Sequence, residues 1–170
     1  MNQETRDFEV AVKRVIDGPG SVDHCSCAEV VMEILRERLG LSCAVATAAA
    51  APFGGGVAGS GGPCGAFSAG LIALGIWMGE NVRSDGCVSD AVGGASAAYF
   101  DLWMERFSSI MCATLTGFPQ LRVEAVRDSF FSGGGPQKCT DNYMRFAVET
   151  VPELIERWWS TSLEEDTCSR

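Results

Sequence analysis

The sequence has a single histidine and no Cys-x-x-Cys pair, although it contains 8 cysteines in 170 residues. The shortest cysteine spacing is Cys25-Ser26-Cys27. Zinc ribbons, thioredoxin-type sites and ferredoxin runs are built on Cys-x-x-Cys spacing, so the sequence argues against all three classes. Any centre that these cysteines share must therefore be assembled from separate segments of the chain.

Long hydrophobic runs and positive charge are also scarce. The longest apolar stretch, residues 64–78, contains several glycines and is shorter than the roughly 20 residues of a membrane helix, so we expect no membrane span. No apolar signal segment follows the polar residues 1–7, which predicts a reducing, cytoplasmic location. The formal net charge of -9 makes nucleic acid an unfavourable partner.

Sustained period-two alternation of apolar residues is absent, so the sequence predicts no strand. Apolar residues instead recur at helical spacing, which predicts an all-α fold. We expect a single helical domain over residues 1–170, an irregular bundle of about five to seven helices with a glycine-rich loop before the Cys64 helix. Residues 1–20 are predicted to form an N-terminal helix and linker, and residues 160–170 a disordered acidic tail.

Local signals mark several helix ends. Ser26 can cap a helix that Gly40 stops, and Pro152 is expected to kink the last helix or start a new one. Tyr99 and Trp103 lie on the inner stripe of another helix, which we interpret as core packing. The predicted helices cover residues 5–17, 26–39, 64–78, 91–106 and 136–159, with shorter helix candidates at 44–51, 110–115 and 123–131.

Glycines are concentrated in residues 53–70, ahead of and within the predicted Cys64 helix. Such a cluster indicates tight turns or a main chain that approaches another group closely. A phosphate-binding Walker loop is not predicted, because Cys64-Gly65 stands where its lysine and Ser/Thr would be. No strand-like run precedes the loop, which also argues against a dinucleotide site. The candidate cofactor-binding glycines are Gly54, Gly55, Gly56 and Gly65.

Four cysteines share one predicted setting, the first turn of a helix: Cys27, Cys64, Cys112 and Cys139. Backbone N–H groups at a helix start favour a thiolate. If the four helix starts converge, they suit an iron–sulfur cluster or another metal, or dithiols that cycle to disulfides. The count of four thiolates favours the cluster. All four are therefore candidate metal ligands, and Cys64 and Cys139 are the candidate redox-catalytic thiols.

The other cysteines and the histidine carry no assigned role. Cys25 and Cys87 are predicted in loops and Cys168 in the tail, while Cys43 follows a predicted helix. His24, the sole histidine, fits a solvated loop better than a metal site. Without a compelling neighbour for His24, acid–base and serine-type catalysis have little support.

At the four helix starts the sequence resembles the redox-active protein family named for its cysteine pattern, C_GCAxxG_C_C. The resemblance runs from about Cys27 to Leu154. One position departs from the pattern, since the glycine expected at the end of the central motif is Ala69, followed by Gly70. The resemblance implies redox activity and fixes neither substrate nor cofactor. The matching residues are Cys27-Ala28-Glu29-Val30-Val31, Phe53-Gly54-Gly55-Gly56, Cys64-Gly65-Ala66-Phe67-Ser68, Cys112 and Cys139.

Three functions remain open on sequence grounds. The first is a redox centre that exchanges electrons with a partner protein or with a small-molecule donor or acceptor. The second is a closed four-thiolate zinc site that serves folding alone. The third is a helical interaction module, such as a homodimer through the small-residue helix at residues 64–78, with inert cysteines.

Overall fold

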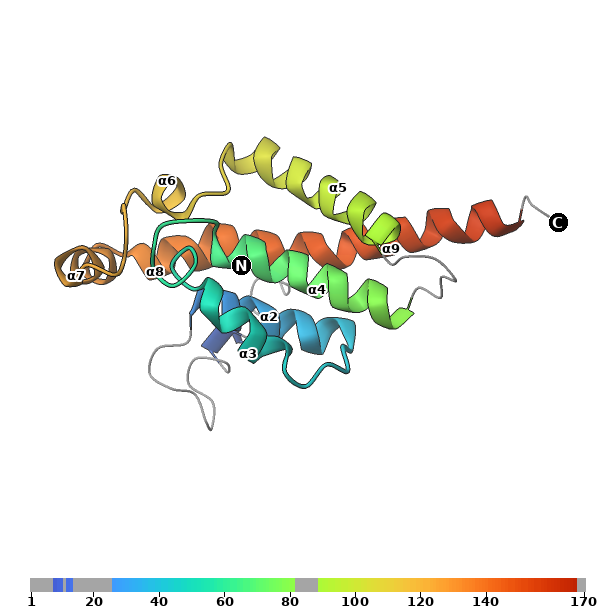
Figure 1. Ribbon diagram of the computed structural model, residues 1–170, viewed down its shortest axis with the longest axis horizontal. Coiled ribbons are helices and arrows are strands. Elements are labelled where there is room, and N and C mark those ends of the chain that lie inside the picture. Colours follow the sequence, from blue (N-terminus) through green and yellow to red (C-terminus); the bar gives the residue numbers. More distant parts are fainter. Residues whose placement is uncertain (1–7, 11, 14–25, 82–88, 168–170) are drawn as a thin grey trace.

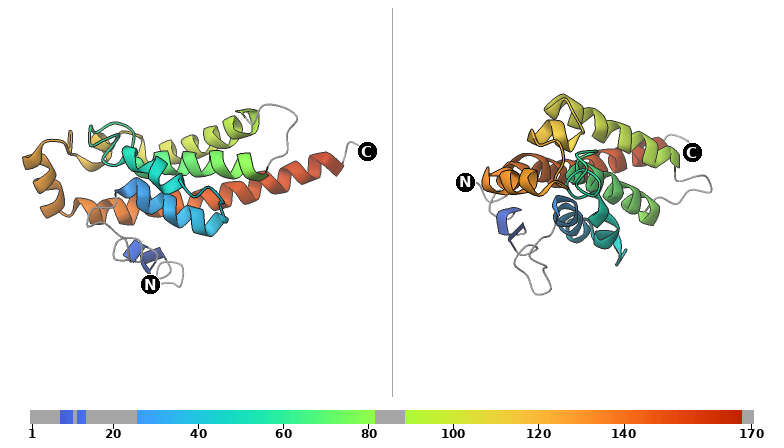
Figure 2. Two further views of the ribbon diagram at one scale, coloured as in Figure 1. Left: turned by 60° about the horizontal axis from the view of Figure 1, so that its bottom comes forward. Right: turned by 60° about the vertical axis from the view of Figure 1, so that its left-hand side comes forward.

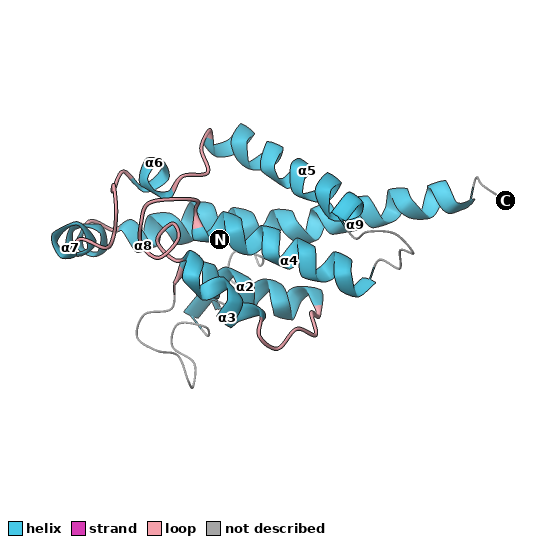
Figure 3. Cartoon of the chain, in the orientation of Figure 1, coloured by secondary structure: helices cyan, strands magenta, loops and turns pink. Residues whose placement is uncertain are grey.

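The computed structural model describes residues 8–10, 12–13, 26–81 and 89–167 (Figure 1). These residues form helices and no strand, which confirms the all-α fold class (Figure 3). The elements are α2 (Cys27–Leu39), α3 (Ala46–Ala50), the short helix η1 (Ala51–Phe53), α4 (Gly65–Asn81), α5 (Ser89–Phe107), α6 (Cys112–Thr116), α7 (Glu124–Ser132), α8 (Gly135–Lys138), the π-helix η2 (Cys139–Met144) and α9 (Arg145–Thr167).

Helix α4 lies at the centre of the bundle and contacts α2, α5 and α9 (Figures 1 and 2). The N-terminal ends of α2 and α4 lie at the same end of the molecule as α6, α8 and the glycine loop between η1 and α4 (Figure 1). This end is where the sequence-predicted site residues gather. None of the helices in the described parts of the chain combines the length and hydrophobicity that crossing a membrane requires.

The two end signals of α2 act as predicted. The Ser26 hydroxyl accepts a hydrogen bond from the Glu29 N–H, and the Glu29 carboxylate accepts one from the Ser26 N–H at 2.8 Å. Gly40 ends the helix with a φ of 64°. Such a reciprocal cap satisfies N–H groups that would otherwise have no partner, so it defines where Cys27 enters the fold.

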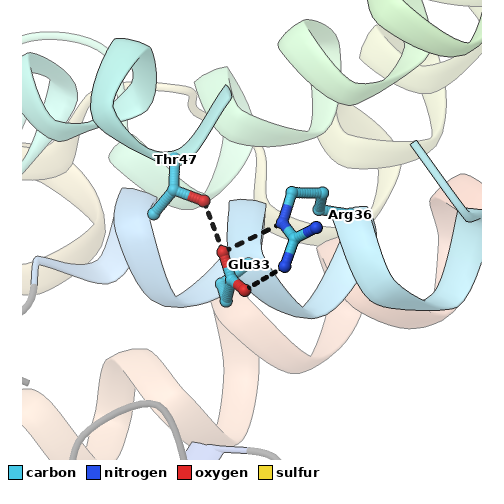
Figure 4. A network of polar contacts seen from close by, with 3 residues as sticks. All are labelled: Glu33, Arg36 and Thr47. Carbon is cyan, nitrogen blue, oxygen red and sulfur yellow. Dashed lines mark hydrogen bonds and ion pairs between the residues drawn. The ribbon is translucent and has the colours of Figure 1, made fainter. Parts of the chain in front are cut away.

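A polar network holds α2 to α3. The Glu33 carboxylate accepts hydrogen bonds from the Arg36 guanidinium and from the Thr47 hydroxyl, each at 2.6 Å (Figure 4). Glu33 and Arg36 are both half-buried, because α3 covers part of this face of α2. The network fixes the short helix that leads into the glycine loop.

Aromatic side chains fill the space between α4, α5 and α9. Trp103 is fully buried, and its ring centroid lies 5.1 Å from that of Phe67 and 4.9 Å from that of Phe107. The Trp103 indole donates to the Ser109 carbonyl at 2.9 Å. Tyr99 stacks on Phe67 with centroids 5.3 Å apart. The predicted aromatic stripe is therefore core.

Two segments differ from the sequence prediction in extent. Helix α9 continues through Pro152 as one element and through most of the predicted tail to Thr167. After Pro152 no glycine or proline interrupts it, and leucine and glutamate favour helix. Of the predicted helix 5–17, residues 8–10 and 12–13 are helical, and the remainder lies outside the described residues, as does the linker up to residue 20.

Tyr99→Phe is expected to raise the free energy of unfolding by about 1 kcal/mol, because an unpaired buried polar group costs stability. The Tyr99 hydroxyl is buried and finds no hydrogen-bond partner among the described residues. Tyr143→Phe is the matched control, because the Tyr143 hydroxyl donates to the Leu115 carbonyl at 2.6 Å. Its loss should lower stability by about 1 kcal/mol. Urea unfolding of both variants checks the pair, and destabilisation of Tyr99→Phe would contradict the expectation.

Candidate functional site

Three glycines bring the loop into contact with the predicted site. A Cβ on Gly65 would lie 2.8 Å from the Cys27 Sγ, and a Cβ on Gly56 would lie 2.7 Å from the Cys112 Cβ. A Cβ on Gly54 would lie 2.5 Å from the Cβ of Ser26. Glycine is thus required at these positions because the main chain there packs closely against other residues of the protein.

A short antiparallel bridge fixes Cys64 beside Cys112. Pro63 pairs with Met111, the Cys64 N–H donates to the Ile110 carbonyl, and the Cys112 N–H donates to the Gly62 carbonyl, each at 2.7 Å. These bonds join the glycine loop to the start of α6. This bridge therefore holds side by side two cysteines that are 48 positions apart in the sequence.

Cys139 reaches the same region through contacts between η2 and α6. The Leu115 carbonyl accepts hydrogen bonds from the Lys138 ammonium at 2.9 Å and from the Tyr143 hydroxyl at 2.6 Å. Both donors flank Cys139 in sequence, so together they hold its helix against α6. Sequence reasoning missed Lys138, Leu115 and Tyr143 as positioning residues, since nothing in their spacing reveals a shared carbonyl.

The prediction that Cys139 lies in the first turn of a helix is wrong by one turn. Gly134, with a φ of 76°, is the N-cap of α8, so the helical segment begins at Gly135. Cys139 is instead the first residue of the π-helical stretch η2. Single π-helical turns within helices are frequent at functional sites.

Cys27 is the first residue of α2, and its sulfur also faces the start of α4. Burial raises the pKa of the Cys27 thiol, while backbone hydrogen bonds from Gly55, Ala66 and Ala28 lower it. Those N–H groups come from the glycine loop and from two helix starts. The Cys27 sulfur thus lies in a nest of donors contributed by three segments.

The four cysteines interact electrostatically. Negative charge on Cys27 raises the pKa values of Cys64, Cys112 and Cys139, and negative charge on Cys112 raises those of Cys64 and Cys139. The structure therefore brings the four sequence-predicted cysteines into one neighbourhood. Cys64 and Cys112 are buried, whereas Cys27 and Cys139 are half-buried.

Burial is the main cause of every one of these shifts. It raises the pKa of Cys112 to about 11 and that of Cys139 to about 12, and it raises the pKa of Cys64 further. A hydrogen bond with Thr116 opposes the rise at Cys112, and the Lys138 ammonium opposes it at Cys139. The expectation that helix starts would favour thiolates is wrong for these thiols, because desolvation raises their pKa values more than the N–H groups lower them.

The thiols are neighbours without forming a ligand set. Among the residues that the structure describes, no three His, Cys, Asp or Glu side chains form a group that could hold a metal ion. An iron–sulfur cluster or zinc at Cys27, Cys64, Cys112 and Cys139 would require the sulfurs to draw together and to lose their protons. The arrangement as it stands fits neutral thiols, and all four are free.

The remaining candidates lie elsewhere. Cys43 is a free, half-buried thiol in the segment between α2 and α3, where the neighbouring Ser42 bonds to Glu80. His24, Cys25, Cys87 and Cys168 lie outside the described residues.

The pattern of four cysteines and close-packed glycines has a counterpart in known proteins. A family model described as "Putative redox-active protein (C_GCAxxG_C_C)" matches residues 25–154. The chain belongs to this family. The C_GCAxxG_C_C resemblance inferred from the motifs is thereby confirmed, and the family description supports a redox-active protein. No curated protein and no solved structure matches the chain.

The departure from the C_GCAxxG_C_C motif at Ala69 is accommodated by the next residue. Ala69 is fully buried, whereas a Cβ on Gly70 would lie 2.5 Å from the Tyr99 hydroxyl oxygen. Gly70 therefore provides the close approach of α5 to α4. The extra methyl group at Ala69 lies in the core.

Proposed function

We propose that Cys27, Cys64, Cys112 and Cys139 form a thiol–disulfide redox centre. The observation that carries the proposal is that the four thiols come from four separate segments that meet at the glycine-loop end of the bundle. The Pro63–Met111 bridge sets Cys64 beside Cys112. The Cys27 sulfur lies against Gly65, and the Leu115 carbonyl holds the segment of Cys139. The electron partner is a disulfide or dithiol, borne by a redox protein or by a small molecule. The family description supports the redox role and names neither a cofactor nor a substrate.

The reaction balances as a two-electron exchange. A thiolate of the centre attacks a partner disulfide, forms a mixed disulfide and releases one partner thiolate, which takes up the proton. A second thiol of the centre then attacks the mixed disulfide and releases the second partner thiol. The centre loses two electrons and two protons, and the partner disulfide becomes two thiols.

Burial of the four thiols limits which molecules can react with them. Since Cys64 and Cys112 are 4% and 6% exposed, a partner reaches them only through the half-buried thiols. Buried, protonated thiols react slowly with stray oxidants, because the thiolate is the nucleophile. We expect the centre to react with partners that approach the glycine-loop end of the bundle.

Thiol counting under denaturing conditions tests the proposal. We expect reduced protein to lose two thiols for each disulfide when it is treated with oxidised glutathione, and mass spectrometry to map the bonds within the four-cysteine set. Cys43→Ser should behave as the wild type, because Cys43 lies outside the centre. An unchanged thiol count, or a disulfide mapped only between molecules, would refute the proposal.

A cluster-binding centre is the second candidate, favoured by the four-thiol count and by the N–H nest at Cys27. Anaerobically purified protein would then be brown and contain iron and labile sulfide.

Zinc that is removed by a chelator with loss of helicity would indicate the structural site instead. If Cys64→Ser and Cys139→Ser left redox response and assembly unchanged, the homodimer or interaction-module reading would be favoured.

A further inference from the structure

We infer that α9 contains a hinge at Pro152 and that Arg38 of α2 holds this hinge closed through a hydrogen bond to the Val148 carbonyl. The inference is independent of the proposed redox function, because it concerns what keeps a helix continuous and not what the thiols do. It follows from the position of Pro152, from the bond that Arg38 makes and from the course of α9 beyond the proline.

Pro152 removes one hydrogen bond from the interior of α9. The helix runs from Arg145 to Thr167 with this proline inside it. In an α-helix each N–H donates to the carbonyl four residues back, which for position 152 is the carbonyl of Val148. Proline has no N–H, and its ring crowds that same carbonyl, so an interior proline commonly kinks or breaks a helix. Residue 152 is therefore the weak point of α9.

Arg38 supplies the missing donor from another helix. Its guanidinium Nη1 donates to the Val148 carbonyl oxygen at 3.1 Å. Val148 is only 1% exposed, so water has little access to this carbonyl in place of Arg38. A buried carbonyl without a donor costs stability, and a bond from a charged donor is stronger than one between neutral groups. The acceptor that Arg38 satisfies is the one that Pro152 leaves without a helical partner.

Helix α9 continues past Pro152 as one element (Figure 1). Val151 and Ile155, one on each side of the proline, are both buried in the core. Packing of these side chains therefore also favours the closed hinge. The experiment must separate this packing from the bond that Arg38 makes.

The Arg38 bond joins two helices that lead away from the four cysteines. Helix α2 begins at Cys27, and α9 follows directly on η2, which begins at Cys139. Arg38 lies in the last turn of α2, so it ties the two helices at the end remote from these thiols. We therefore expect Arg38 to set the direction of residues 153–167 relative to the bundle.

A double-mutant cycle between Arg38 and Pro152 tests the inference. Arg38→Met keeps an apolar stem and removes the donor, so the folding equilibrium constant of the reduced full-length protein should fall about tenfold. Pro152→Ala restores an N–H that can donate to the Val148 carbonyl. In that background Arg38→Met should lower the equilibrium constant by less than about threefold. Urea unfolding of the four proteins measures the difference.

Arg38→Lys and Arg36→Met are the matched controls. Lysine keeps a charged donor on a long stem, so Arg38→Lys should retain part of the stability that Arg38→Met loses. Arg36 pairs with Glu33 within α2 at 2.6 Å and makes no contact across the hinge in that pair. Arg36→Met should therefore have the same effect with and without Pro152→Ala.

Hydrogen exchange shows where the chain opens. In Arg38→Met the amides of residues 153–156, whose helical acceptors are residues 149–152, should exchange at least about fivefold faster, and Pro152→Ala should reverse this. Equal losses from Arg38→Met in both backgrounds would overturn the inference and show that core packing alone holds α9. If Arg38→Met alone fails to fold, recovery of folding by Pro152→Ala supports the inference, and failure of the double variant overturns it.

Discussion

Gly65→Ala is expected to lower the free energy of unfolding by about 3 kcal/mol, since overpacking a well-packed core is costly. The new methyl group would meet the Cys27 sulfur and the Phe53 carbonyl oxygen, each at 2.8 Å, and the Ala28 Cβ at 3.1 Å. A carbonyl oxygen and the first turn of α2 cannot move aside without disturbing the glycine loop. The variant should therefore separate α2 from α4 at the four-cysteine centre.

Gly75→Ala in the same helix is the matched control. No atom lies within 4 Å of a Cβ built on Gly75, so alanine should raise stability by about 0.5–1 kcal/mol through its helix propensity. Urea unfolding of the two reduced variants measures the difference. Equal stability of both variants would contradict the contact seen at Gly65, and loss of stability only at Gly75 would indicate that a second molecule covers that face.

The local features of the fold could be predicted from the sequence. Ser26 and Gly40 are strong end signals that act within a few residues, so the bounds of α2 follow from them. The aromatic stripe at Tyr99 and Trp103 follows from helical periodicity in the same way. The glycine cluster indicated close approaches, and Gly54, Gly56 and Gly65 make them.

The assembly of the site could be predicted only in part. The shared helix-start setting predicted for Cys27, Cys64, Cys112 and Cys139 pointed to these four, and the family pattern added weight, although Cys139 lies one turn into its helix. What brings Cys64 beside Cys112 is the bridge between Pro63 and Met111, a long-range pairing that leaves no periodic trace in the sequence. The same holds for the Leu115 carbonyl, which holds η2 against α6 through donors from two residues.

The direction of the thiol pKa shifts was predicted wrongly. Helix starts were expected to lower these pKa values, and burial, which the prediction left out, raises them. A helix start contributes a local field, which can be read from the sequence. Desolvation depends on how many elements pack around the sulfur, and here α2, α4, α6 and η2 all do so. Cys112, the first residue of α6, therefore has a pKa raised to about 11 instead of lowered.

Reduced protein is expected to lose stability steeply as the pH rises above about 9, because its buried thiols must then ionise. The folded-state pKa values of Cys112 and Cys139 are about 11 and 12, and that of Cys64 is also strongly raised. In the unfolded chain the thiols titrate near about 8.5. The folded state thus holds more protons between these values, so its stability is full below the unfolded pKa and falls toward the folded ones.

The size of this pH effect follows from the three thiols. A single thiol that stays protonated in the folded state contributes up to about 1.4 kcal/mol per pH unit between its unfolded and folded pKa values, so several such thiols should give a steeper slope than one group alone. Urea midpoints of reduced protein from pH 7 to 10.5 measure the slope. Oxidised protein is the control, because a disulfide removes two titrating thiols and should flatten the dependence. A flat profile in the reduced state would show that these thiols are not buried together.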